Sequence, residues 1–193
     1  MKLTVPTASE TPPLFDESDM LLMSWEVMLQ IECFIGDVTA EHGGVLGGSR
    51  EDGIVQSFHF DRSARPSSAT YSPDTASLKR LFADDWNPRG INMLGFVHSH
   101  PPGVTRPSGG DLIYAERILS ANPSLSRLLL PIIVTTADAG AFELLPYAAV
   151  RGGNRSIRIA PLMLLLGQFP ASRTATGMPN LGTGLSGNGC KVA

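Results

Sequence analysis

Residues 91–111 read INMLGFVHSHPPGVTRPSGGD, and this stretch carries the strongest structural signal in the chain. Residues 91–97 are almost wholly apolar, which is typical of a short buried strand. His98 and His100 follow two positions apart, so an extended backbone points both imidazoles to the same side. Pro-Pro-Gly at 101–103 then forces a loop. The stretch predicts a buried strand that presents two histidines at its end.

A helix is predicted to begin after this loop. Ser108 is a favourable N-cap residue, and Asp111 falls in the first helical turn. Two histidines and one carboxylate suffice to hold zinc while leaving a fourth position open, as catalytic zinc sites do. Ser-x-x-Asp is also close to a capping box, which is a purely structural alternative. We treat the two roles of Asp111 as exclusive, and the neighbouring histidines favour the metal.

Hydrophobic periodicity predicts strands that alternate with helices, hence an α/β domain. We expect strands at 20–23, 43–48, 54–60, 91–97, 131–136 and 141–150, and a further element at 157–166. We expect helices that begin at the N-caps Ser24, Ser72 and Ser108 and end near residues 36, 85 and 122. Residues 61–72 are expected to form an exposed loop.

The length of 193 residues fits one domain with extensions. Residues 1–18 are rich in Pro, Ser and Thr, and residues 167–193 are rich in Gly. Such compositions are typical of flexible segments. We therefore expect a flexible arm at 1–18, one domain at 19–166 and a flexible tail at 167–193.

Composition argues against several classes of partner. The chain has 15 Lys and Arg against 18 Asp and Glu and no basic stripe, so we expect no nucleic-acid partner. Its longest apolar runs, 128–134 and 160–166, are too short for a membrane span, and each contains a proline. No signal-peptide pattern opens the sequence, and its two cysteines form no CxxC metal motif. We expect a cytoplasmic protein without a membrane partner.

The pattern His-x-His-x7-Ser-x2-Asp, which runs from His98 to Asp111, resembles the motif of the JAMM metalloproteases. Residues 41–48, EHGGVLGG, are similar to the Glu-x-x-Gly-hydrophobic-Leu-x-Gly segment of that family. The resemblance covers about residues 20–150. It implies the JAB/MPN fold, a cytidine deaminase-like mixed sheet flanked by helices. Deaminase chemistry is disfavoured because the sequence lacks His-x-Glu and Pro-Cys-x-x-Cys.

The resemblance implies an enzyme with one zinc ion per chain. His98, His100 and Asp111 would hold the zinc. Glu41 would take a proton from water and return it to the leaving amine, and Ser108 would donate a hydrogen bond to the oxyanion. The implied reaction is hydrolysis of isopeptide or peptide bonds, which removes or matures a ubiquitin-like protein at its C-terminal glycine. Ubiquitin-like proteins or their conjugates would be the partners, together with activating (E1-like) and conjugating (E2-like) enzymes.

Two alternatives stay open. The first is a JAB peptidase with an unrelated peptide substrate, such as a phage-tail or cell-wall-linked one. The second is a non-catalytic MPN scaffold, against which the complete set of metal residues argues. A gene neighbourhood that encodes a ubiquitin-like protein would favour the main hypothesis over the first alternative.

The polar stretch ahead of the second helix is expected to line the substrate channel, because JAMM enzymes have groove-forming elements there. Its candidate residues are Ser67, Ser68, Thr70, Tyr71 and Ser72. His42 and His59 are interpreted as ordinary structural residues, because neither belongs to the motif. Ser99 points to the opposite face of its strand from the two histidines and is interpreted as a packing residue.

Overall fold

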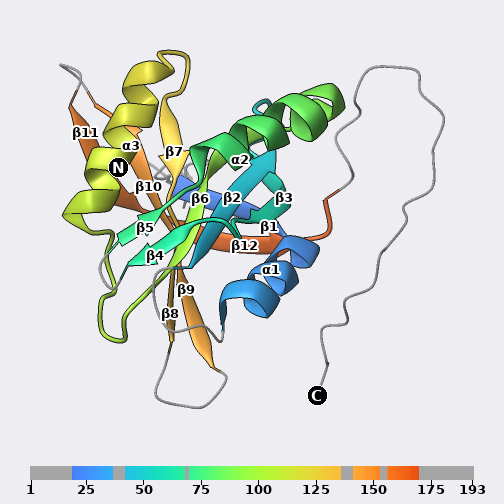
Figure 1. Cartoon of the computed structure of the whole chain (residues 1–193). Coiled ribbons are helices and arrows are strands. Elements are labelled where there is room, and N and C mark those ends of the chain that lie inside the picture. The colour runs from blue at the N-terminus through green and yellow to red at the C-terminus, as the bar shows by residue number, and fades with distance from the viewer. Residues whose placement is uncertain (1–18, 37–41, 68–69, 136–140, 153–155, 170–193) are drawn as a thin grey trace, which may run out of the picture.

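The structure of the chain is a computed structural model (Figure 1). The predicted arm and most of the predicted tail lie outside the residues that it describes. The structure describes residues 19–36, 42–67, 70–135, 141–152 and 156–169, without the side chains of residues 65–67, 70 and 72.

A mixed sheet forms the centre of the described part of the chain (Figure 1). Its strand order is β11-β10-β7-β6-β2-β3-β1-β12, while β8 pairs with β6 and β9 pairs with β8. β6 runs parallel to β7 and β8 and antiparallel to β2. The strands are β1 (Met20–Ser24), β2 (Gly43–Gly48), β3 (Ile54–Phe60), β6 (Asn92–His100), β7 (Arg127–Leu129), β8 (Ile132–Thr135), β9 (Phe142–Leu145), β10 (Tyr147–Arg151), β11 (Ile157–Pro161) and β12 (Met163–Gly167).

Helices cover both faces of this sheet, and each face has its own hydrophobic core. The helical segments are α1 (Trp25–Ile31) with the π turn Glu32–Gly36, α2 (Thr75–Arg80) with its continuation Leu81–Trp86 and Asn87–Arg89, and α3 (Gly109–Ala121). Leu46 and Val97 belong to the core that α1 closes. Their neighbours Val45 and Phe96 belong to the core that α2 and α3 close. This alternation is expected for a strand with both faces buried. The predicted α/β class, a mixed sheet flanked by helices, is confirmed.

Local signals predicted the start of α1 correctly and the start of α2 wrongly. The Val27 N–H donates to the Ser24 hydroxyl at 3.3 Å, so Ser24 is the N-cap of α1 as expected. For α2 the N-cap is Asp74, not Ser72, because the Asp74 carboxylate accepts the N–H groups of Ala76 and Ser77 at 3.0 and 3.2 Å. A carboxylate two residues further on satisfies two helix N–H groups at once.

Three other predicted segments differ from the structure. The expected loop at 61–72 contains a hairpin, β4 (Arg65–Ser67) paired antiparallel with β5 (Thr70–Ser72). The expected strand at 141–150 is two strands, β9 and β10, interrupted at Pro146. Residues 157–166 form β11 and β12, and β12 lies parallel to β1 along its whole length. No helix in the described part of the chain is long and apolar enough to cross a membrane.

Candidate metal centre

The two histidines of the motif lie at the end of the central strand β6. They share the face of Phe96, which α3 covers, whereas Val97 and Ser99 face the α1 side. His98 lies between Gly43 of β2 and Ile132 of β8 in the sheet register. Each histidine is 3 % exposed, so both imidazoles are held in a nearly dry environment.

Asp111 joins the two histidines from the first turn of α3. The Nε2 atom of His98 lies 2.8 Å from Nε2 of His100 and 3.1 Å from Oδ1 of Asp111. Oδ2 of Asp111 lies 3.4 Å from Nε2 of His100. The three side chains therefore converge on one point, as the motif predicts.

The loop after β6 orients the ring of His100. Its Nδ1 atom lies 3.2 Å from the Val104 carbonyl oxygen. A carbonyl only accepts, so Nδ1 carries the proton and Nε2 of the neutral ring keeps its lone pair. The Tyr147 hydroxyl donates to the Thr105 carbonyl at 2.8 Å and ties the same loop to β10. A backbone carbonyl behind a histidine is a common support for a metal ligand.

Asp111 caps α3 and still faces both histidines, so the premise that its carboxylate could not do both was wrong. Oδ2 accepts the Ser108 N–H at 2.6 Å, and the Asp111 N–H donates to the Ser108 hydroxyl at 3.2 Å, which completes a capping box. The carboxylate still faces both histidines because it has two oxygens with several lone pairs. Burial alone would raise the pKa of Asp111, but the two adjacent imidazoles and the hydrogen bond from the Ser108 N–H lower it well below its usual range.

The arrangement fits a divalent metal. Two imidazoles and one carboxylate are the ligand types that zinc prefers, and with bonds of 2.0–2.1 Å its tetrahedral ligands lie about 3.3 Å apart. The three measured separations, 2.8 to 3.4 Å, are close to that spacing. Within the described residues this is the group of His, Cys, Asp and Glu side chains that could hold a metal ion.

A cavity of about 310 Å³ opens beside this centre. His98 and Asp111 line it together with Tyr71, which comes from the β4–β5 hairpin. The ring of Tyr71 stacks on the ring of His98, with centroids 5.9 Å apart and planes 15° apart. Tyr114 and Arg117 extend the wall along α3. The cavity is large enough for a short segment of substrate next to the metal ligands.

The remaining predicted site residues are only partly described. Glu41 and Ser68 lie outside the described residues, as do the side chains of Ser67, Thr70 and Ser72. Ser108 is exposed, and its hydroxyl caps α3. Tyr71 is therefore the one predicted channel residue whose side chain the structure describes, and it contacts a metal ligand.

Sequence reasoning underestimated Ser99 and missed Asp61. Ser99 is fully buried, and its hydroxyl accepts the His42 N–H at 3.2 Å and donates to the His42 carbonyl at 3.3 Å. Ser99 therefore holds the start of β2 against β6 between the two ligands. Asp61 receives the Tyr71 hydroxyl at 3.3 Å. The available signal for Asp61 was a carboxylate directly after the predicted strand 54–60, but the sequence does not show which side chain it contacts.

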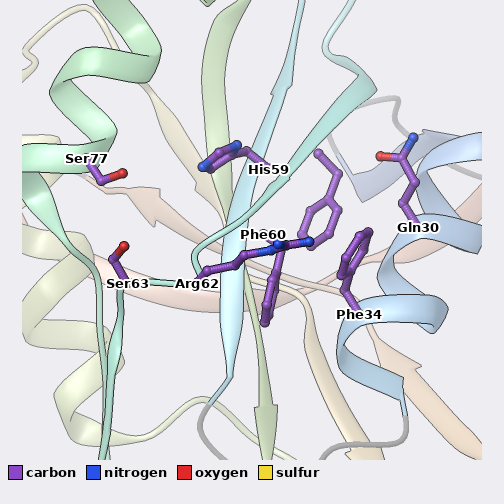
Figure 2. A pocket seen from close by; sticks show the side chains of 8 residues that line it. Gln30, Phe34, His59, Phe60, Arg62, Ser63 and Ser77 are labelled. Atoms are coloured by element: carbon purple, nitrogen blue, oxygen red, sulfur yellow. The ribbon is translucent and has the colours of Figure 1, made fainter. Parts of the chain in front are cut away.

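A second cavity, of about 450 Å³, lies between α1 and β3 (Figure 2). Phe34 stacks on Phe60 with centroids 5.3 Å apart, and the guanidinium of Arg62 lies 5.9 Å from the centre of the Phe34 ring. His59 also lines this aromatic groove, and its pKa is lowered mainly by burial. The groove is rich in aromatic surface and contains no carboxylate among its lining residues.

The fold and this centre together define an α/β domain that presents a His-His-Asp cluster at the end of a central strand. The family model for prokaryotic homologs of the JAB domain matches residues 36–145, which is more than half of the chain. The protein therefore belongs to the prokaryotic JAB family, and the predicted JAB/MPN fold is confirmed.

A solved structure supports the fold. The chain is similar to the solution structure of protein DSY2949 from Desulfitobacterium hafniense, at a TM-score of 0.53 and 20 % identity. The similarity covers 78 % of this chain and 94 % of that one. Comparison with curated proteins gave no significant match.

Proposed function

We propose that the protein is a zinc-dependent hydrolase that cleaves peptide or isopeptide bonds after the C-terminal glycine of a ubiquitin-like protein. The observation that carries this proposal is the convergence of His98, His100 and Asp111 in a buried position beside a cavity. Side chains that only stabilise the fold would not need three ligand atoms aimed at one point.

His98, His100 and Asp111 would hold the zinc ion. Bound zinc supplies Lewis-acid chemistry, polarising a carbonyl and activating water near neutral pH. The protein keeps these ligands ready for it: the Val104 carbonyl fixes the tautomer of His100, and the Ser108 N–H holds one oxygen of Asp111. Fixed ligands reduce the reorganisation that metal binding and catalysis would otherwise require.

Glu41 is proposed to accept the proton of the attacking water and to return it to the leaving amine. Its sequence neighbour His42 is bonded to Ser99, the residue between the two histidine ligands, through both backbone groups of His42. The Ser108 hydroxyl accepts the Asp111 N–H and is proposed to donate a hydrogen bond to the developing oxyanion.

The substrate is proposed to be an extended glycine tail that lies along the β4–β5 hairpin, where Ser67, Ser68, Thr70, Tyr71 and Ser72 are the candidate contacts. Strand-like backbone hydrogen bonds to a short hairpin can bind a tail without demanding particular side chains. Glycine suits the end of such a tail because it lets the scissile bond approach buried ligands closely. Conjugating enzymes as partners and a cytoplasmic location remain predictions that accompany this substrate.

A cleavage assay tests the proposal. The zinc-loaded protein should cut a fusion that bears a ubiquitin-like domain directly after the terminal glycine of that domain, and replacement of this glycine by Leu should stop the reaction. Cleavage elsewhere in the fusion, indifferent to that replacement, would favour the peptidase with another substrate. Absence of metal from the purified protein would favour the hypothesis of a non-catalytic scaffold.

Glu41→Gln provides the matched variant for this assay. It should keep zinc and the fold but lose about 10²–10⁴ of the turnover rate, because the proton acceptor is removed and the ligands are not. Elemental analysis and circular dichroism of the variant check that zinc and fold are retained. Turnover close to that of the parent would assign the proton transfer to another residue.

A further inference from the structure

Asp61 is a buried carboxylate that directly follows β3 and is only 4 % exposed. Its backbone N–H donates to the Gly43 carbonyl at 3.0 Å. Its carboxylate accepts the Ser63 N–H at 3.2 Å and the Asp74 N–H at 2.8 Å. Hydrogen bonds of this kind compensate for burying a carboxylate. Asp61 thereby ties the start of β2, the end of β3 and the N-terminus of α2 together.

The same carboxylate anchors Tyr71. The Tyr71 hydroxyl donates to Oδ2 of Asp61 at 3.3 Å. Burial, reinforced by the charge of Asp61, raises the pKa of Tyr71 far above its ordinary value, so the phenol keeps the proton that it donates. Asp61 therefore fixes the hydroxyl end of Tyr71, and backbone N–H groups fix the carboxylate of Asp61.

The face of the Tyr71 ring rests on the ring of His98, with centroids 5.9 Å apart and planes 15° apart. Gly43 leaves the space for this contact: a Cβ atom there would lie 2.7 Å from the Val97 carbonyl oxygen, 2.9 Å from Cζ of Tyr71 and 2.9 Å from Cβ of His98. A larger residue at this position would clash with the backbone of β6 as well as with both side chains of the stack. The stack of Tyr71 on His98 thus depends on three segments of the chain, namely β2, the β4–β5 hairpin and β6.

The two histidines are supported in different ways. His100 is oriented by a hydrogen bond to the Val104 carbonyl. For His98 the corresponding support is a flat surface, the Tyr71 ring, held in place by Asp61. Partners behind the ligands fix the orientation of metal-binding imidazoles and contribute to metal affinity.

We propose that Asp61 and Tyr71 are positioning residues that fix the plane of the His98 imidazole and thereby raise the affinity of the centre for metal. The inference rests on the proposed function only in that the centre binds a metal. It assigns no chemical step to either residue.

Zinc affinity, measured by competition with a chromophoric chelator on the full chain, tests the proposal. Tyr71→Leu should weaken zinc binding about 10- to 100-fold. Tyr71→Phe keeps the ring and should weaken it less. The matched control is Tyr114→Leu, since Tyr114 is half-buried in the same cavity but packs edge-on against Phe96 at 5.4 Å. The control should bind zinc like the parent protein.

Asp61 is tested by conservative rescue. Asp61→Ala removes the acceptor of the Tyr71 hydroxyl, whereas the amide oxygen of Asp61→Asn can still accept both this hydroxyl and the Asp74 N–H and keep the ring in place. Zinc affinity should therefore fall in the order parent, Asp61→Asn, Asp61→Ala. If Asp61 had a purely structural role, its substitutions would lower the melting temperature of the metal-free protein without producing this order of zinc affinities.

Nuclear magnetic resonance of the metal-free protein gives a readout that does not depend on zinc or on hydrolysis. The ring signals of His98 should shift in Tyr71→Leu because the stacked ring current is lost, and they should shift more than those of His100, whose ring centroid lies 4.6 Å from that of His98. Wild-type zinc affinity in Tyr71→Leu, or unshifted His98 signals, would overturn the inference. If Tyr71→Leu does not fold, the zinc affinities of Asp61→Asn and Asp61→Ala decide, and equal affinity of both variants and the parent protein would overturn the inference. A parent protein that binds zinc but cleaves no fusion would refute the proposed function and leave this inference standing.

Discussion

The cavity beside His98 and Asp111, here called the metal cavity, is lined mainly from β6 and α3, and the aromatic groove is lined mainly from α1 and β3. The two differ in the side chains that they bring together. The aromatic groove is the larger, at about 450 Å³ against about 310 Å³. It collects Phe34, Phe60 and Arg62, which pack against one another. The metal cavity collects His98 and Asp111, whose polar atoms converge. Convergence of ligand atoms, not volume, distinguishes the site where chemistry is expected.

Removing one histidine from each cavity tests most directly whether only the metal cavity binds zinc. His98→Ala should take the zinc content from about one ion per chain to none, because two remaining ligands cannot hold zinc firmly. His59→Ala should leave the zinc content unchanged. Elemental analysis of protein prepared without chelator measures both. Zinc retained by His98→Ala, or lost from His59→Ala, would place the metal elsewhere.

The second test compares the N-caps of the helices that border the two cavities. Ser108→Ala and Ser24→Ala should each lower the free energy of unfolding by about 1 kcal/mol, since each removes a hydroxyl that caps a helix. Only Ser108→Ala should also lower kcat, by about 10² or more with a smaller change in KM, because an oxyanion exists only near the transition state. Denaturant unfolding and steady-state kinetics separate the two effects. A change confined to KM would restrict Ser108 to capping or substrate contact.

A third test removes aromatic surface from the groove. Phe34→Ala should lower the free energy of unfolding by about 1–2 kcal/mol, less than for a fully buried phenylalanine, because Phe34 is 38 % exposed. Zinc affinity and turnover should not change. Urea denaturation and chelator competition measure the two quantities. Loss of zinc from a folded Phe34→Ala protein would show that the two cavities are coupled.

The smallest expected effect concerns pH. Burial, and to a lesser extent Arg62, lowers the pKa of His59 below 6.5, although Asp61 and Asp85 oppose this shift. Below pH 6.5 the unfolded chain therefore binds more protons at this residue than the folded one, and stability falls as the pH falls. His59→Gln should flatten this part of the stability–pH curve, just below pH 6.5. An unchanged slope would show that other groups cause it.

Elements with local signals could be predicted from the sequence. The Ser24 cap, the apolar run into His98 and the Ser108 cap each depend on residues within a few positions, and all three occur in the structure. The N-cap of α2 was misplaced because Ser72 and Asp74 compete within one turn. The observed start is favoured by the two helix N–H groups that Asp74 accepts and by Asp61, a residue from another segment that receives the Asp74 N–H.

Contacts between distant segments could not be predicted. The sequence pattern brings His98, His100 and Asp111 together because their spacing is set by one strand, one loop and one helix. Tyr71 was expected in the substrate channel, but its stack on His98 depends on the path of a hairpin from another part of the chain. Asp111 caps α3 and also faces both histidines, and this depends on the angle at which α3 meets the sheet. Neither geometry leaves a periodic trace in the sequence.

The parallel pairing of β1 with β12 has a consequence for how the protein is made. β1 is the first described strand to leave the ribosome and β12 the last, yet they are neighbours from Met20↔Met163 to Ser24↔Gly167. Contacts between such distant segments are slow to form, because a long loop must close first. β6 and α3, which carry His98, His100 and Asp111, are synthesised before β12. During synthesis, the backbone edge of β1 that pairs with β12 stays unpaired after these segments have emerged, and a chaperone that shields this edge would act in that interval.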